Sequence, residues 1–310
     1  MNNFDRFLVQ PFDVLKIRYQ LQVEKKALAK YKSLRGMVTT ISTEEGLTAF
    51  WKGHMTAQYL SVIYMAIQFG LNEVFTRQMF EIFPSLKKSD SDTKMLALAR
   101  SACGAPAAVC ATLASYPFDV MRTRKIAQLS SPDMRKSKMY YSTTIASARC
   151  IWTVEGPRAF YKGLTPQLVS MVPYSALAFG FYEFLTQTCY RANLNTFTSS
   201  EDGQKYLGFY SKCMCSAFSG VLAKSLTYPL DTVRKRLQVQ GFEQGRIGMG
   251  ETPKYSGMKD CFAKIFQVEG FRGFFKGIVP GNLKAAISTL LYFQLYEIFK
   301  KKISQLRQKQ

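Results

Sequence analysis

The sequence predicts an all-α membrane protein built from three homologous blocks of about a hundred residues each. Three observations support this fold class. A short charged motif occurs three times at intervals of 106 and 112 residues, the landmarks after each copy keep one register, and charge-poor segments of near-membrane length recur between them. The repeat is much longer than a solenoid period, so we expect the blocks to close on one another.

Each copy of the motif begins with proline and continues with an acid, a base and an arginine at fixed spacing. The copies are PFDVLKIR at 11–18, PFDVMRTR at 117–124 and PLDTVRKR at 229–236. A proline inside a helix bends it, and an acid and a base three residues apart share one helical face. Three bent helices around one axis would let each acid meet the base of the next helix. The motif therefore predicts a closed ring of ion pairs, whereas three separate surface pairs would need no proline.

The landmarks after each motif are a tyrosine, a Glu-Gly, a Lys-Gly behind two aromatic residues, and a second glutamate. From tyrosine to final glutamate the distance is 42 residues in every block, whereas the distance from proline to tyrosine is 20, 24 or 26 residues. Length changes are tolerated in loops and resisted in packed elements. We therefore expect a variable loop after each motif helix.

Several segments between the landmarks are poor in charge and nearly long enough to cross a bilayer. Residues 54–72 and 163–182 contain no Asp, Glu, Lys or Arg, and 278–296 contain one charge, Lys284. Mean hydropathy is only −0.09, which suits helices that are wet on one face around a cavity. Buried helices of a soluble protein would explain any single span, but their three-fold recurrence with the motif favours the membrane.

The net charge of +21 lies mainly between each motif and its Lys-Gly: segments 14–52, 120–162 and 232–276 supply +17 of it. If the spans cross a bilayer, these basic segments all lie on one side and attract anionic lipid head groups. A basic RNA-binding protein is the alternative from another class. No nucleic-acid-binding motif accompanies the charge, so no nucleic-acid partner is expected.

Nothing in the sequence supports catalysis. It has no glycine-rich phosphate loop, no nucleophile elbow and one histidine, His54, and its seven cysteines do not form a disulfide framework. We therefore predict no catalytic residue, no metal site and no cofactor.

The three motif copies, each followed by Glu-Gly and aromatic-Lys-Gly, resemble the mitochondrial carrier family over nearly the whole chain. The resemblance implies a six-transmembrane-helix bundle with three-fold pseudosymmetry in the mitochondrial inner membrane. Its three two-helix repeats, each with a short matrix-side helix, would be residues 1–82, 94–192 and 205–303. Together they would form one transport domain of a monomeric, multi-pass transporter that works by alternating access.

The same resemblance assigns roles to the repeated residues. It implies a matrix gate of three ion pairs, Asp13–Arg122, Asp119–Arg234 and Asp231–Lys16, with Gln20 and Gln238 where the family places bracing glutamines. It also implies cardiolipin sites at the Glu-Gly and Lys-Gly positions, where helix N-termini meet lipid phosphate. These are Gly46, Gly53, Gly156, Gly163, Gly270 and Gly277.

The family's cytoplasmic gate motif, aromatic-acid-x-x-base, is complete in one copy only. YEIFK contains Glu297 and Lys300, whereas YEFLT contains Glu183 without a base and NEVFT contains Glu73 without a base. Three acids with one basic partner predict a weak cytoplasmic gate. An empty carrier of this kind should favour the form that is open to the cytoplasm.

The substrate expected from these residues is anionic. Lys224 and Lys284 would present cations to it, although Lys224 could instead extend to the membrane interface. Gln68, Ser170, Met171 and Tyr174 fall near the levels where the family contacts substrate. No arginine occurs at 170–171, which argues against a keto acid or amino acid and favours a larger phosphorylated solute.

Longer strings, among them LAKSLTYPLDTVRKRLQVQGFEQ and FFKGIVPGNLKAAISTLLYFQLYE, resemble family members that take up thiamine pyrophosphate in exchange for nucleotides. Two lysines would bind the diphosphate of this substrate, and Tyr64 or Tyr174 would face its cationic ring. Another phosphorylated solute, such as an adenine nucleotide, a deoxynucleotide or coenzyme A, is the alternative.

Only ten residues precede Pro11. Ten helical residues rise about 15 Å, against a hydrocarbon core of about 30 Å. We therefore expect the first helix to be short on its intermembrane-space side.

Overall fold

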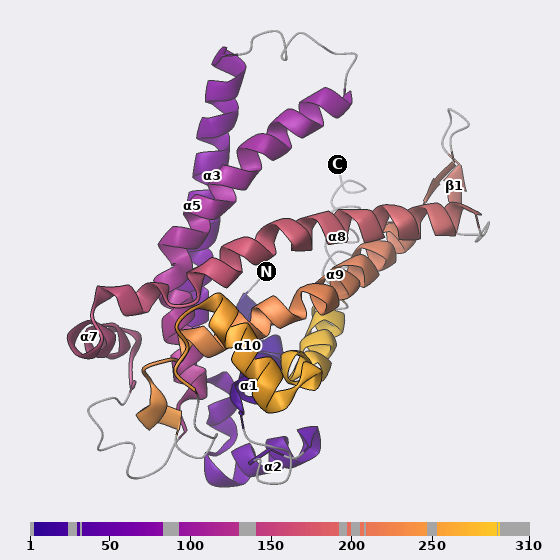
Figure 1. Cartoon of the computed structure of the whole chain (residues 1–310). Helices are drawn as coiled ribbons and strands as arrows, with labels where there is room; N and C mark the ends of the chain where they lie inside the picture. The colour runs from indigo at the N-terminus through magenta and orange to yellow at the C-terminus, as the bar shows by residue number, and fades with distance from the viewer. Residues whose placement is uncertain are drawn as a thin grey trace, which may run out of the picture.

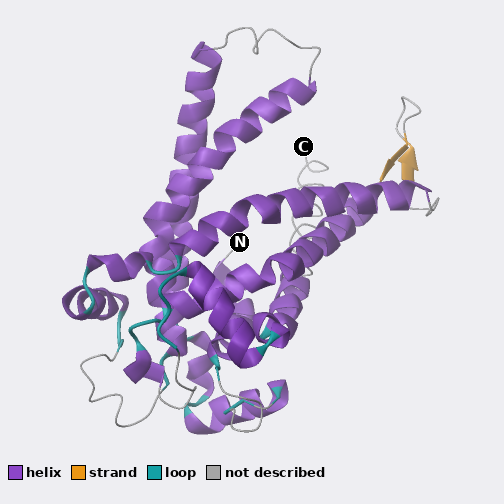
Figure 2. Ribbon diagram, in the orientation of Figure 1, coloured by secondary structure: helices purple, strands orange, loops and turns teal. Residues whose placement is uncertain are grey.

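The computed structural model describes residues 3–23, 30–31, 33–82, 93–129, 141–191, 197–199, 205–207, 209–246, 253–289 and 291. Most of these residues are helical (Figure 2). The long helices are α1 (Asn3–Leu21), α3 (His54–Ile82), α5 (Thr93–Ala127), α8 (Leu164–Arg191), α9 (Phe209–Gln238) and a last helix over 278–289.

Each block adds a short helix and one turn of 3₁₀ helix between its two long helices. The short helices are α2 (Leu34–Glu44), α7 (Thr144–Val154) and α10 (Met258–Glu269), and they precede η1 (Leu47–Trp51), η2 (Pro157–Tyr161) and η4 (Phe271–Phe275). A further turn, η3, spans Glu243–Arg246. The helix order predicted from the repeats is confirmed.

Local sequence explains where the short helices begin. Ser33 caps α2 by accepting a hydrogen bond from the Gly36 amide at 3.0 Å, and Thr143 caps α7 in the same way from the Ala146 amide at 3.1 Å. Such caps satisfy an amide that has no partner inside the helix. The variable loops end at these caps, so the length differences between blocks stay outside the packed units.

The long helices converge at one end of the molecule and separate at the other. In Figure 1 the hairpin of α3 and α5 and the hairpin of α8 and α9 rise from a common base and diverge, while α2, α7 and α10 lie around that base. The motif prolines lie inside continuous helices, which run nine or ten residues beyond them. The motifs therefore lie near the base, where α1, α5 and α9 meet.

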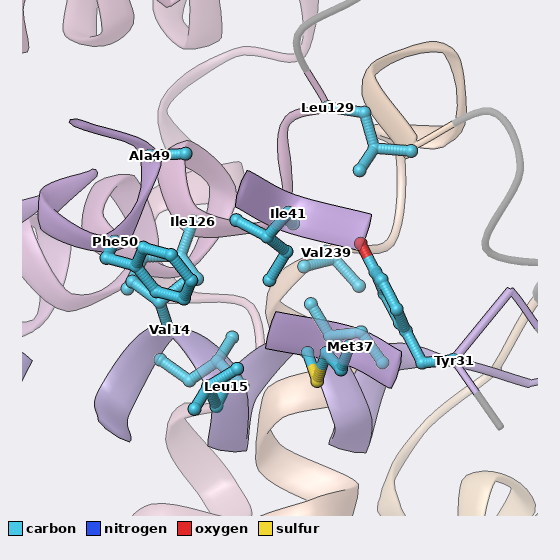
Figure 3. Close-up of a cluster of buried hydrophobic side chains, with 13 residues drawn as sticks. Val14, Leu15, Tyr31, Met37, Ile41, Ala49, Phe50, Ile126, Leu129 and Val239 are labelled. Atoms are coloured by element: carbon cyan, nitrogen blue, oxygen red, sulfur yellow. The ribbon is translucent and has the colours of Figure 1, made fainter. Parts of the chain in front are cut away.

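The buried apolar side chains gather at the same base. One cluster joins the end of α1 to α2 and to the loops after α5 and α9, with Tyr31, Met37 and Ile41 at its centre (Figure 3). Two smaller clusters repeat this arrangement around α7 and α10. By contrast, large apolar side chains of the hairpins face outward: Phe69 is 72 % exposed and Phe179 is 76 % exposed. This distribution fits helices that are surrounded by lipid above a packed base.

Two features go beyond the prediction. The connection between α8 and α9 contains two short antiparallel strands, β1 (Phe197–Ser199) and β2 (Lys205–Leu207). Within the described residues, one helical segment, Pro157–Arg191, is both long enough and apolar enough to cross a membrane by composition alone.

Candidate functional site

A ring of three ion pairs closes the base of the bundle. Arg122 of α5 contacts Asp13 of α1 at 2.5 Å, and Arg234 of α9 contacts Asp119 of α5 at 2.8 Å. The third pair joins Lys16 of α1 to Asp231 of α9. Each of the three motif helices is therefore tied to both others, in the pairing that the family resemblance implies. That this ring acts as a gate stays a prediction.

The three acids of the ring do not have equal surroundings. Asp13 also accepts a hydrogen bond from Lys284 of the last helix at 2.7 Å, so two bases share one carboxylate. Asp119 forms a second ion pair, with Lys235, at 3.1 Å. Lys16 is the one base that forms an ion pair with Asp231 among the described residues. Sequence reasoning missed Lys235. The signal was a difference between the motif copies: the third reads RKR, with a base at the middle position, where the others read KIR and RTR.

The two glutamines expected to brace the ring behave differently. Gln238 contacts Asp119 and also accepts hydrogen bonds from Lys235 at 2.9 Å and from Thr123 at 2.8 Å. Gln20 donates to Thr232 at 3.4 Å, and the contacts described for it do not include the Lys16–Asp231 pair. The bracing geometry is therefore present at Asp119 and not at Asp231.

A cavity of about 270 Å³ lies directly above the ring. Its floor is Asp119 and Arg234, and its walls come from α1, α3, α5, α8 and α9. Polar side chains in these walls include Ser61, Tyr64, Thr112, Ser115 and Gln167. Pockets that combine apolar walls with a few polar groups are typical of small-molecule sites.

The residues expected to bind substrate are only partly brought together here. Tyr64 lines the cavity, whereas Lys284 lies at Asp13. The amino group of Lys224 forms no hydrogen bond or ion pair with any described residue, although the charges of Lys16 and Asp231 act on it.

The remaining four lie outside the cavity lining, on α3 and α8. Ser170 donates to the Gln167 carbonyl of its own helix at 2.7 Å, and the Met171 sulfur lies 4.0 Å from the Thr112 hydroxyl. Tyr174 is 41 % exposed, and Gln68 is half-buried without a described polar contact. Sequence reasoning placed these side chains by their level in the membrane, but the rotation of α3 and α8 decides which of them face inward.

A second set of ion pairs below the ring was not predicted. The last arginine of each motif is buried and forms a bidentate ion pair with the glutamate of the following Glu-Gly. In each block the Nη2–Oε2 distance is 2.9 Å. The lysine of the following Lys-Gly contacts the same glutamate. We call these residues the lower clamp: Arg18, Glu45 and Lys52; Arg124, Glu155 and Lys162; Arg236, Glu269 and Lys276.

The lower clamp also joins one block to the next. Each arginine side chain donates to a backbone carbonyl of another block. Arg18 donates to the carbonyl of Ile126 at 3.0 Å, Arg124 to the carbonyl of Gln238 at 3.0 Å, and Arg236 to the carbonyl of Gln20 at 3.2 Å. Since each bond reaches the end of the next motif helix, the clamp closes a second ring. The recurrence of arginine at the end of each motif, with a Glu-Gly after it and a Lys-Gly seven residues beyond the glutamate, was the signal in the sequence that could have revealed it.

The glycines of the Lys-Gly sites permit close contact between helices. Gly163 has a φ of +80°, and a Cβ added there would lie 2.8 Å from the carbonyl oxygen of Arg234. Gly277 repeats this geometry against Lys16, with a Cβ at 2.8 Å from its carbonyl oxygen. Gly46, Gly156 and Gly270 have positive φ and open space beside them. A lipid-binding role for all six glycines stays a prediction.

The two described acids of the expected outer gate form contacts within their own helices. Glu73 pairs with Arg77 of its own helix at 3.3 Å, and both side chains are more than 70 % exposed. Glu183 accepts a hydrogen bond from Gln187, also of its own helix, at 3.5 Å. Glu297 and Lys300 lie outside the described residues.

The sequence profile described as "Mitochondrial carrier protein" matches residues 3–82, 94–193 and 205–306. The chain belongs to the mitochondrial carrier family. It is 40% identical over 298 residues to the human mitochondrial thiamine pyrophosphate carrier, which covers 95% of this chain and 87% of the relative. It is 31% identical over 313 residues to mitochondrial thiamine diphosphate carrier 1 of Arabidopsis thaliana (94% and 88%), and 33% identical over 301 residues to mitochondrial thiamine pyrophosphate carrier 1 of Aspergillus terreus (94% and 86%).

This carrier is thus a multi-pass transporter of the mitochondrial inner membrane and not an enzyme. In the family's orientation, the side of the short helices is the matrix side. The ring of ion pairs lies on that side, and the two hairpins diverge on the opposite side (Figure 1).

Introducing a basic residue near each of the cytoplasmic-gate acids Glu73 and Glu183 should favour the form of the carrier that is closed toward the cytoplasm. Thr76→Lys and Thr186→Lys place a base three residues after Glu73 and Glu183, as in the complete motif. Exposed ion pairs contribute about 0.2–1 kcal/mol each, so two should raise the ratio of that form to the other about twofold or more. Distances between spin labels on the outer turns of α3 and α8 measure it, and Thr76→Gln with Thr186→Gln is the uncharged control. Equal distance distributions in both variants would contradict the prediction.

Proposed function

We propose that this carrier imports thiamine pyrophosphate into the matrix in exchange for nucleotides, by alternating access to the cavity above the ring. Residues 1–82, 94–192 and 205–303 would be its three repeats and act together as one monomeric transport domain. Cardiolipin would bind at the glycine sites on the matrix side, where each 3₁₀ turn and each following long helix begins. The names of the relatives support this substrate, and the charge around the cavity supports its chemistry.

The observation that carries the proposal is an excess of cations around the ring below the cavity. Three acids of the ring face six bases: Lys16, Arg122, Arg234, Lys224, Lys235 and Lys284. Three positive charges are therefore left without an acid of their own among the described residues. A diphosphate ester carries about two to three negative charges near neutral pH, so it matches this excess better than a monocarboxylate does.

The rest of the substrate also suits the cavity. A ring with a positive charge is attracted to the face of an aromatic side chain, and Tyr64 stands in the wall contributed by α3. Thr112, Ser115 and Gln167 provide further hydrogen-bonding groups for a heteroaromatic ring. The diphosphate would lie toward the ring and the cationic end toward the walls.

Uptake of labelled thiamine pyrophosphate into liposomes that contain the purified carrier and internal ADP tests the proposal. We expect uptake that depends on the internal nucleotide and that is inhibited by unlabelled thiamine pyrophosphate more strongly than by thiamine, coenzyme A or a deoxynucleotide. Faster exchange of a nucleotide or coenzyme A, with no uptake of thiamine pyrophosphate, would assign the carrier to another phosphorylated solute.

Lys224→Gln should weaken substrate binding without removing any ion pair described for the ring. A charge-assisted hydrogen bond contributes about 1.5–3 kcal/mol, so we expect the KM for thiamine pyrophosphate to rise about tenfold or more. Lys212→Gln is the matched control, because Lys212 lies on the same helix, α9, and is exposed near its outer end. An equal rise of KM in both variants would contradict the role of Lys224.

A further inference from the structure

Two thiols meet at the outer end of the α8–α9 hairpin, away from the cavity and the ring. The Sγ atom of Cys189 lies 3.7 Å from the Sγ atom of Cys215. Cys189 precedes the end of α8 by two residues, and Cys215 follows the start of α9 by six. In Figure 1 this end of the hairpin lies beside the β1–β2 connection and opposite the short helices.

The geometry allows a covalent bond between these sulfurs. A disulfide has a sulfur–sulfur distance of about 2.05 Å, so the two atoms must approach by about 1.7 Å. Cys189 is half-buried and Cys215 is 6 % exposed, so the pair is partly shielded. A site with one accessible thiol beside a second one suits stepwise exchange with a small disulfide.

The other hairpin contains the same contact with one sulfur changed. Met79 and Cys189 each follow an outer-gate glutamate, Glu73 or Glu183, by six residues, and Cys103 and Cys215 each precede a motif proline by fourteen. The Sγ atom of Cys103 lies 3.5 Å from the Sδ atom of Met79. A thioether cannot form a disulfide, so the α3–α5 hairpin is a built-in comparison.

We propose that Cys189 and Cys215 form a redox-sensitive modification site, which an organic disulfide oxidises to an intramolecular disulfide that slows transport. The two thiols lose two protons and two electrons, and the organic disulfide takes up both and leaves as two thiols. The new bond ties α8 of the second repeat to α9 of the third. Since α9 also carries Asp231 and Arg234, its movement when the ring opens would be restrained at the outer end.

Treatment of the full-length carrier in liposomes with oxidised glutathione tests the proposal. We expect mass spectrometry to find peptides joined through Cys189 and Cys215, and we expect thiamine pyrophosphate uptake to fall several-fold and to recover with dithiothreitol. Cys189→Ser and Cys215→Ser should retain their uptake under the same oxidation. The uptake readout rests on the proposed function, whereas the joined peptides report on the site even if another solute is transported.

A second variant separates a local effect from a general one. Met79→Cys in the Cys189→Ser background should regain redox sensitivity through Cys103, because it recreates the thiol pair in the other hairpin. The absence of joined peptides in the unmodified chain would overturn the proposal. Equal inhibition of Cys189→Ser, or joined peptides with unchanged uptake, would overturn it as well.

Discussion

Exchanging the charges of Lys16 and Asp231 is expected to restore part of the transport that either single reversal abolishes. Asp231→Lys leaves Lys16 facing a second cation, and Lys16→Asp leaves Asp231 facing a second anion. Removing one partner of a buried ion pair costs about 3–5 kcal/mol. If the cost falls on the closed ring, each reversal should lower uptake about 100-fold or more.

The structure selects this pair over the other two for a clean test. Asp119 is also bound by Lys235, and Asp13 is also bound by Lys284, so a reversal at either acid creates a second clash. The rescue at Lys16 and Asp231 should still be partial, because a lysine at 231 would face Lys224.

Reversal of an exposed pair supplies the control. Glu44→Lys alters the pair with Lys30, in which the Glu44 side chain is 50% exposed, so its effect on uptake should be within about twofold. Uptake by the Lys16→Asp, Asp231→Lys double variant that is no higher than that of the single variants would mean that the pair does not act as a gate.

Much of the fold could be predicted from the sequence because the segment from the tyrosine to the final glutamate has the same length in all three blocks. Proline, acid and base at fixed spacing predict that α1, α5 and α9 meet in a closed ring of ion pairs, and the family resemblance implies the order in which they pair. The outer ends are less determined. NEVFT and YEFLT lack the bases that would hold them together, and in the structure Glu73 and Glu183 form contacts within their own helices.

The inner site could be predicted less well because it depends on helix rotation. Lys284 was expected to face the substrate, but in the structure it forms an ion pair with Asp13. The rotation of the last helix relative to α1 decides which of these two groups Lys284 faces. Tyr174 was expected in the cavity and is 41 % exposed. The level of a side chain along the membrane follows from the sequence, but its angular position follows from packing between blocks.

Glu45→Gln is expected to destabilise the carrier by about 3 kcal/mol, far more than the same change at the preceding residue. The Glu45 side chain is 3% exposed and accepts hydrogen bonds from Arg18 and Lys52 in the lower clamp. The substitution leaves two cations, one of them fully buried, without their counter-ion. Glu44 is 50% exposed and pairs with Lys30, so Glu44→Gln should cost less than about 1 kcal/mol. Thermal unfolding of the purified variants in detergent measures the difference, and equal melting temperatures would show that the clamp contributes nothing.

The dependence of this difference on pH distinguishes a charge effect from a packing effect. Burial alone would raise the pKa of Glu45, but hydrogen bonds from Arg18 and the charges of Arg18 and Lys52 lower it to about 2. A carboxyl group with a folded pKa below its unfolded value stabilises the fold above the unfolded pKa, about 4.3. That stabilisation is lost as the pH falls from about 5 toward 2. The gap in melting temperature between Glu45→Gln and the unmodified carrier should therefore narrow over this range, whereas a gap caused by packing would stay constant.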